Sequence, residues 1–175
     1  KWTGPIIDNH FHLNRNGLFL SAANDFKNAG GTGLILVHCP NFQSPPVTLN
    51  EHKKAYFDTI LMAEQVRENV GIDVRVVLGP HPAAFAHQFE TWFSDQGEKG
   101  AQRAIENYND SIEAALEFIH EGKAVAIGEV GRPHWDAPKE VFDLSNQLLE
   151  ETMKLARTEK IPLQLHMEEN GNQTF

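Results

Sequence analysis

The sequence predicts an α/β fold in which parallel strands alternate with helices, in the manner of a (β/α)8 TIM barrel. Five short apolar runs, each typical of a buried strand, are separated by longer segments with helical periodicity. A histidine or a glutamate stands at the end of every run. Strand–helix alternation favours a parallel sheet with right-handed crossovers. Periodicity alone leaves an open doubly wound sheet as the alternative, although no Gly-x-Gly-x-x-Gly turn follows the first strand.

Each expected strand is an apolar run that ends beside a polar residue. The run from Leu34 to Val37 is apolar throughout, which is typical of a strand buried on both faces of a parallel sheet. The strands are expected over residues 5–10, 34–38, 74–78, 124–128 and 161–165.

Four helices are expected between these strands, because apolar residues recur near helical spacing. Thr48 or Asn50 is a suitable cap for the second helix, and glycines favour the left-handed position that ends a helix. The helices are expected over residues 20–28, 49–70, 111–119 and 139–158. The aromatic segment over residues 83–100 fits neither pattern, and we expect it to be an irregular excursion over the barrel rim.

Length and composition restrict the class of protein. The 175 residues predict a single domain, 1–175, and no run approaches the roughly 20 apolar residues that span a bilayer. The net charge of −9 disfavours binding to a long stretch of nucleic acid, because cationic side chains supply most of the affinity for phosphates. Cys39 has no second cysteine to pair with, which favours a reducing, cytoplasmic location.

Candidate metal ligands gather at the strand ends. His10 and His12 share one face of the first strand, because side chains alternate along a strand. The full set is His10, His12, His38, His81, Glu129 and His166. The carboxyl ends of barrel strands converge, and imidazoles with a carboxylate suit zinc, manganese or iron. One or two divalent cations held there would activate water, and Glu129 could bridge two of them.

Four blocks of sequence carry a resemblance to a known family. They are Ile-Asp-Asn-His-Phe-His at 7–12, Gly-Pro-His-Pro at 79–82, Ala-Ile-Gly-Glu-Val-Gly at 126–131 and Leu-Gln-Leu-His at 163–166. In order and strand placement the blocks resemble the TatD-related metal-dependent hydrolases, which lie within the amidohydrolase-like TIM barrels. Gly-Arg-Pro-His at 131–134 and His-Met-Glu at 166–168 are most similar to the archaeal branch.

The resemblance implies a TIM barrel, a divalent metal and hydrolysis of phosphodiesters, in small molecules or in DNA. Zinc is the first choice of metal, with manganese, magnesium or iron as alternatives. The resemblance assigns His10, His12, Glu129 and His166 as metal ligands, with Glu129 as the shared, catalytic carboxylate.

The family pattern also includes a later histidine and a terminal-strand aspartate, which this sequence does not reach before Phe175. A typical barrel needs about 250 residues. We therefore expect the chain to cover about the first five of eight βα units. A half-barrel leaves two sheet edges unpaired, so we expect another copy or another chain to complete it.

Further polar residues near the strand ends are candidates for binding substrate or orienting a ligand. Asp8 lies on the same face as His10 and is expected to orient a ligand histidine. Arg132 and His134 could bind a phosphate, Arg132 through two parallel hydrogen bonds from its guanidinium group. His38 and His81 are candidates for the same role or for hydrogen-bonded structure alone. The remaining histidines are expected to face solvent; they are His52, His87 and His120.

Two other functions stay open at this point. The same metal barrel could act on a cyclic amide or lactone, where a carboxylated lysine between two metals would be diagnostic. No lysine is evident on the fourth or fifth strand. The chain could also be a non-catalytic metal-binding barrel fragment.

Overall fold

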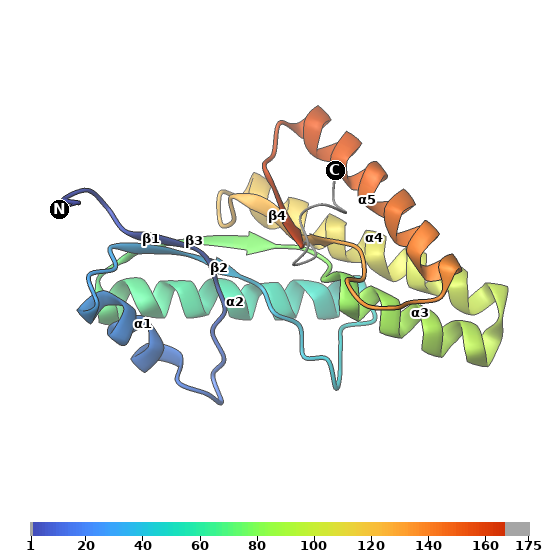
Figure 1. The fold of residues 1–175 in the computed structure, drawn as a ribbon, viewed down its shortest axis with the longest axis horizontal. Coiled ribbons are helices and arrows are strands. Elements are labelled where there is room, and N and C mark those ends of the chain that lie inside the picture. The colour runs from blue at the N-terminus through green and yellow to red at the C-terminus, as the bar shows by residue number, and fades with distance from the viewer. Residues whose placement is uncertain (1, 167–175) are drawn as a thin grey trace.

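A single parallel sheet of five strands forms the framework of the structure, a computed structural model that describes residues 2–166 (Figure 1). The strands lie in sequence order, β1-β2-β3-β4-β5, and every neighbouring pair is parallel. The strands are β1 (Ile7–Phe11), β2 (Gly33–Val37), β3 (Asp73–Leu78), β4 (Ala126–Gly131) and β5 (Leu163–His166). This order is the one that successive right-handed βα units produce.

The helices connect the strands and bury the core against the sheet. Within the described range they are α1 (Phe19–Asn28), α2 (Leu49–Val70), α3 (Pro82–Gln96), α4 (Glu98–His120) and α5 (Lys139–Glu159). One apolar cluster packs α2 against β2 and β3, and a second packs α3, α4 and α5 against β4. None of the helices within residues 2–166 combines the length and the apolar character that crossing a membrane requires.

The sheet is curled, and a contact between its first and last strands reveals how strongly. Neighbouring strands lie about 4.8 Å apart, so β1 and β5 would be roughly 19 Å apart in a flat sheet. Nevertheless Nε2 of Gln164, on β5, donates to the main-chain oxygen of Asn9, on β1, at 2.7 Å. The five strands therefore form a half-barrel, which confirms the predicted α/β class.

The segment over residues 83–100 was predicted wrongly, because it is helical. His81 caps α3 and Pro82 occupies its first turn, a position that tolerates proline. Phe85 and Phe89 lie one helical turn apart and are both buried, so their aromatic pattern is that of a packed helix.

The next helix, α4, begins at Glu98, well before residue 111, where the sequence predicted its start. Gly100 lies in the first turn of α4, where a Cβ would lie 1.8 Å from the main-chain oxygen of Trp92.

The last two strands begin later than predicted, which changes the position of the site residues. Glu129 lies within β4 and His166 is the final residue of β5, whereas both were expected just beyond their strands. Strand geometry therefore fixes the direction of both side chains.

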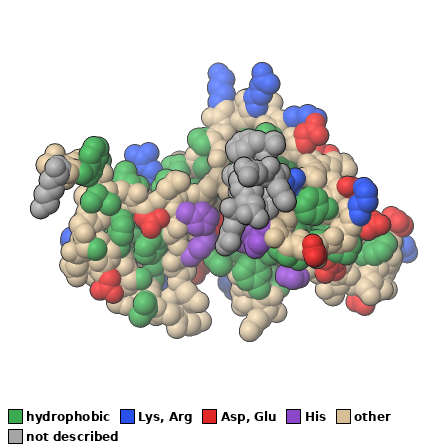
Figure 2. Space-filling view, in the orientation of Figure 1, with side chains coloured by type: hydrophobic (Ala, Val, Ile, Leu, Met, Phe, Trp, Pro, Cys, Tyr) green, Lys and Arg blue, Asp and Glu red, His purple; other side chains and the backbone are tan. Residues whose placement is uncertain are grey.

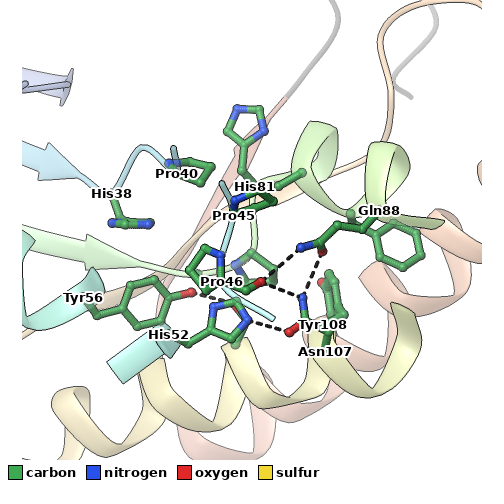
Figure 3. Close-up of a pocket in the computed structure, with 15 residues that line it drawn as sticks. His38, Pro40, Pro45, Pro46, His52, Tyr56, His81, Gln88, Asn107 and Tyr108 are labelled. Carbon is green, nitrogen blue, oxygen red and sulfur yellow. Dashed lines mark hydrogen bonds between the residues drawn. The ribbon is translucent and has the colours of Figure 1, made fainter. Parts of the chain in front are cut away.

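A buried polar network joins α2, α3 and α4 to the segment that follows β2 (Figure 3). Nδ2 of Asn107 donates to the main-chain oxygen of Pro46 at 3.1 Å and to Oε1 of Gln88 at 2.9 Å. Oδ1 of Asn107 accepts from Nε2 of His52 at 3.0 Å. His52 is therefore buried, and the prediction that it faces solvent is wrong, because its face of α2 packs on α4. His87 and His120 are exposed as predicted.

Replacing Asn107 by alanine should lower the free energy of unfolding by about 2–4 kcal/mol, because the substitution leaves His52 Nε2 and Gln88 Oε1 buried without partners. Urea denaturation measures the change. The matched control is Asn109→Ala on the exposed face of the same helix, which should stay within about 0.5 kcal/mol of wild type. Equal effects of the two substitutions would contradict a structural role for the network.

Candidate metal centre

The carboxylate of Glu129 lies at the centre of a group of histidines that gather on one face of the molecule (Figure 2). Glu129 is 4% exposed, and Nδ1 of His166 donates to its Oε1. Its Oε2 is buried and has no hydrogen-bond partner among the described residues. Burial opposes ionisation, but the hydrogen bond from His166 and the nearby His81 and His10 outweigh it, so the pKa of Glu129 is held below its usual value. The group is therefore a buried carboxylate with one oxygen unpaired.

His10, on β1, and His12, the residue just after this strand, lie on the same side, as the alternation of side chains predicts. Their Nε2 atoms are 3.0 Å apart, and those of His10 and His12 lie 3.4 Å and 3.7 Å from Oε2 of Glu129. Nδ1 of His12 donates to the main-chain oxygen of Val37 at 3.0 Å. This bond places the ring proton on Nδ1 and leaves the lone pair of Nε2 directed into the site.

These three atoms have the spacing that a single cation requires. Zinc binds nitrogen and carboxylate oxygen at about 2.0–2.2 Å, so two ligands of a tetrahedral ion lie roughly 3.3 Å apart. The separations among His10 Nε2, His12 Nε2 and Glu129 Oε2 run from 3.0 to 3.7 Å. A cation there would also give the unpaired Oε2 a partner. The donor set therefore fits a divalent metal.

His81 also faces Glu129, but its hydrogen bonds give it a different character. Its Nε2 lies 3.7 Å from Oε2 of Glu129, and with His166 these residues form a second group that could hold an ion. However, Nδ1 of His81 accepts the main-chain N–H of Ala83 at 3.1 Å. Burial lowers the pKa of His81 to about 4, although Glu129 opposes this, so the ring is neutral at pH 7. Its one proton therefore lies on Nε2, which makes His81 a hydrogen-bond donor to the site.

His166 and His134 extend the cluster on the side of β5. Nδ1 of His134 and Nε2 of His166 are 2.8 Å apart, and both nitrogens of His166 are therefore engaged. His134 is exposed on the segment after β4, where its ring contacts Trp135 edge to face. The structure thus brings His134 to a predicted metal ligand.

The other predicted site residues lie near the cluster with partners of their own. Oδ1 of Asp8 accepts the main-chain N–H of His10 at 2.9 Å, so it stabilises the strand through the main chain of a predicted ligand. Nδ1 of His38 bonds Oγ1 of Thr59 at 2.8 Å, and burial lowers the pKa of His38 to about 3.

Arg132, another predicted site residue, packs on a helix. The guanidinium carbon of Arg132 lies 5.2 Å from the ring centre of Phe142, on α5. The roles of these residues toward a substrate stay predictions. Met167 and Glu168 lie outside the described residues.

Close backbone contacts between β4 and β5 position Glu129 against His166. A Cβ at Gly131 would lie 2.4 Å from the main-chain oxygen of His166, so only glycine permits this approach. Gln164 then holds β5 to β1 across the half-barrel. Sequence analysis missed Gln164, although its place two residues before His166 puts both side chains on one face of the strand.

Sequence analysis also missed Phe42, which follows β2. Its ring contacts that of His81 edge to face, with ring centres 5.2 Å apart. No strand or helix pattern covers this segment, so nothing in the sequence indicated the contact.

Comparisons with known proteins show the family to which this chain belongs. A model of the TatD related DNase family matches residues 7–175, which include every residue of the cluster. An archaeal relative, the uncharacterized protein MJ1127 of Methanocaldococcus jannaschii, is 28% identical over 174 residues, or 98% of this chain. The chain spans 58% of the length of that relative. No solved structure matches the chain. The extent of the family match shows that the chain belongs to the TatD related DNase family.

Proposed function

We propose that this protein is a metal-dependent hydrolase of phosphodiester bonds. The observation that carries the proposal is the buried Oε2 of Glu129, which has no hydrogen-bond partner within residues 2–166 and faces imidazole nitrogens from β1 and from the turn before α3. Leaving a carboxylate oxygen buried without a partner costs free energy. A cation would offset that cost, which is why the cluster favours a metal site over a structural hydrogen-bond network.

His10, His12 and Glu129 would hold the first cation. His166 and Glu129 would hold a second cation only by giving up the hydrogen bond that joins them in this structure. A divalent cation there would activate water for attack and stabilise the charge that develops on phosphate oxygens. Zinc is the first candidate because imidazole nitrogens dominate the donor set, and manganese, magnesium and iron are the alternatives.

The chain itself contributes orientation and a proton donor. Val37 fixes the ring of His12 so that its Nε2 faces Glu129. The Nε2–H of His81 points to the same place, where it can donate to a non-bridging phosphate oxygen. Oxygens of this kind gain negative charge in the transition state, so a fixed donor stabilises the transition state more than the substrate.

The family match supports a phosphodiester substrate over a cyclic amide or lactone, because the family is named for DNases, which cleave phosphodiester bonds. The carboxylated lysine expected for an amidohydrolase has no counterpart on β4 or β5, whose sequences contain no lysine. We also place the half-barrel in a complete (β/α)8 architecture. The curl of the sheet and the greater length of the archaeal relative support this placement.

Turnover tests the proposal directly. The protein loaded with zinc or with manganese should hydrolyse DNA or a small phosphodiester, and chelation should abolish the activity, since water activation depends on the cation. Product release is measured by chromatography. Absence of turnover with both metals and both kinds of substrate would refute phosphodiester hydrolysis.

Glu129→Gln should weaken metal binding by at least about 100-fold, more than the 10- to 100-fold typical of losing an outer partner of a ligand. The amide keeps the size of the side chain but removes the negative charge that binds the cation. Calorimetric titration with manganese measures the affinity. Glu140→Gln on the exposed start of α5 is the matched control and should bind as wild type does. Unchanged affinity in Glu129→Gln would place the metal elsewhere.

His81→Asn separates a proton donor from a ligand. Asparagine is a good helix cap and can replace the bond to the Ala83 N–H, so α3 should remain intact. We expect kcat/KM to fall by about 100-fold, with metal affinity within about twofold of wild type. His12→Asn, in contrast, should weaken metal binding itself. If the two variants lose metal affinity equally, His81 is a ligand and the assignment of its proton is wrong.

A further inference from the structure

An open groove leads away from the metal centre between the segments that follow β1 and β2. Both segments extend to the same side of the sheet in Figure 1. The groove has a volume of about 910 Å³ and is lined by residues 12–16 and 39–43, with Asp58 and Met62 of α2. His12 belongs both to this lining and to the group around Glu129, so the groove begins at the metal centre. Its volume lies within the range of roughly 300–1,000 Å³ that small-molecule sites occupy.

The groove offers little positive charge to a ligand. Among the described lining residues the permanent cation is Arg15, and it is paired. Its Nε donates to Oδ1 of Asp58 at 2.8 Å, and its Nη1 donates to Oε1 of Gln65 at 2.7 Å. Nucleic-acid backbones are held mainly by cationic side chains. The groove is therefore poorly suited to a run of phosphates.

Neutral hydrogen-bonding side chains line the groove in place of charges. Oδ1 of Asn14 accepts the main-chain N–H of Asn16 at 2.8 Å, and Oδ1 of Asn41 accepts that of Gln43 at 3.1 Å. These bonds fix both side chains and leave their Nδ2 groups without a partner among the described residues. Asparagine and glutamine side chains can pair with the hydrogen-bonding edge of a base, adenine above all.

Phe42 supplies an aromatic surface at the inner end of the groove. Its side chain is 48% exposed, and its ring meets that of His81 at an interplanar angle of 86°. Since His81 faces Glu129, Phe42 connects the groove to the place of reaction. Exposed aromatic rings of this kind are platforms on which bases stack, with little dependence on sequence.

From these contacts we infer that the groove binds one nucleobase of the substrate, next to the phosphate that lies at the metal centre. Phe42 stacks on the base, and the amides of the two segments contact its edge. The inference rests on the proposed function and deepens it, because it assigns the base of the substrate to a particular groove beside the metal centre. A neutral groove of this size takes a single base more readily than a continuing backbone.

Calorimetry on the metal-loaded protein with two ligands tests the inference. The ligands are 2′-deoxyadenosine 5′-monophosphate and 2-deoxyribose 5-phosphate, which share the phosphate and differ in the base. We expect the nucleotide to bind about tenfold more tightly or better, as base stacking on an aromatic side chain allows. Phe42→Leu should remove most of this difference and leave the affinity for the sugar phosphate within about twofold. Phe93→Leu, at a similarly exposed ring on α3, is the matched control and should retain the difference.

Equal affinities of the two ligands for wild type would overturn the inference, and so would absence of measurable nucleotide binding. It would also fail if Phe42→Leu behaves as Phe93→Leu does, with circular dichroism showing both variants folded. The proposed function stands or falls separately. Hydrolysis of phosphodiesters with no preference for a base would keep that function and remove only the base site, whereas base-dependent binding without any turnover would do the reverse.

Discussion

The curl of the sheet places side chains from opposite ends of the strand order within reach of one carboxylate. His10 lies on β1 and His12 directly follows it, His166 ends β5, and all three contact or approach Glu129 on β4. In a flat sheet the edge strands would be too far apart for this, by several times the length of a hydrogen bond. Gln164 bonds across the opening to Asn9, and a glycine at 131 lets β5 approach β4 closely. The site is therefore a consequence of the fold, since no local segment assembles it.

Main-chain partners give chemically identical rings different roles at this site. The carbonyl of Val37 accepts a hydrogen bond from the Nδ1–H of His12, which leaves the lone pair of this ring on Nε2. The amide N–H of Ala83 does the opposite for His81, because it needs a lone pair on Nδ1 and so places the proton on Nε2. Burial keeps His81 neutral at physiological pH. In the site that we propose, one ring would therefore serve as a ligand and the other as a donor.

Much of this arrangement could be predicted from the sequence, because it depends on regularities that the sequence carries directly. Strand–helix alternation predicted the order of the elements, and strand parity predicted that His10 and His12 share a face. The roles of His12 and His81 could not be predicted, since the partner that fixes each tautomer is set by the folded backbone. The helix α3 was missed because its aromatic spacing was read as irregular, and the burial of His52 depends on Asn107, which lies far away in the sequence.

The most direct measurement is anomalous X-ray scattering from crystals of the zinc-loaded protein, recorded at the zinc absorption edge. We predict a peak about 2.0–2.2 Å from Nε2 of His10, Nε2 of His12 and Oε2 of Glu129. Coordination at that point would show that the curled sheet has gathered these groups to hold a cation. A metal bound only at histidines outside the cluster, such as His87 or His120, would contradict the assignment, because Oε2 of Glu129 would then coordinate no ion.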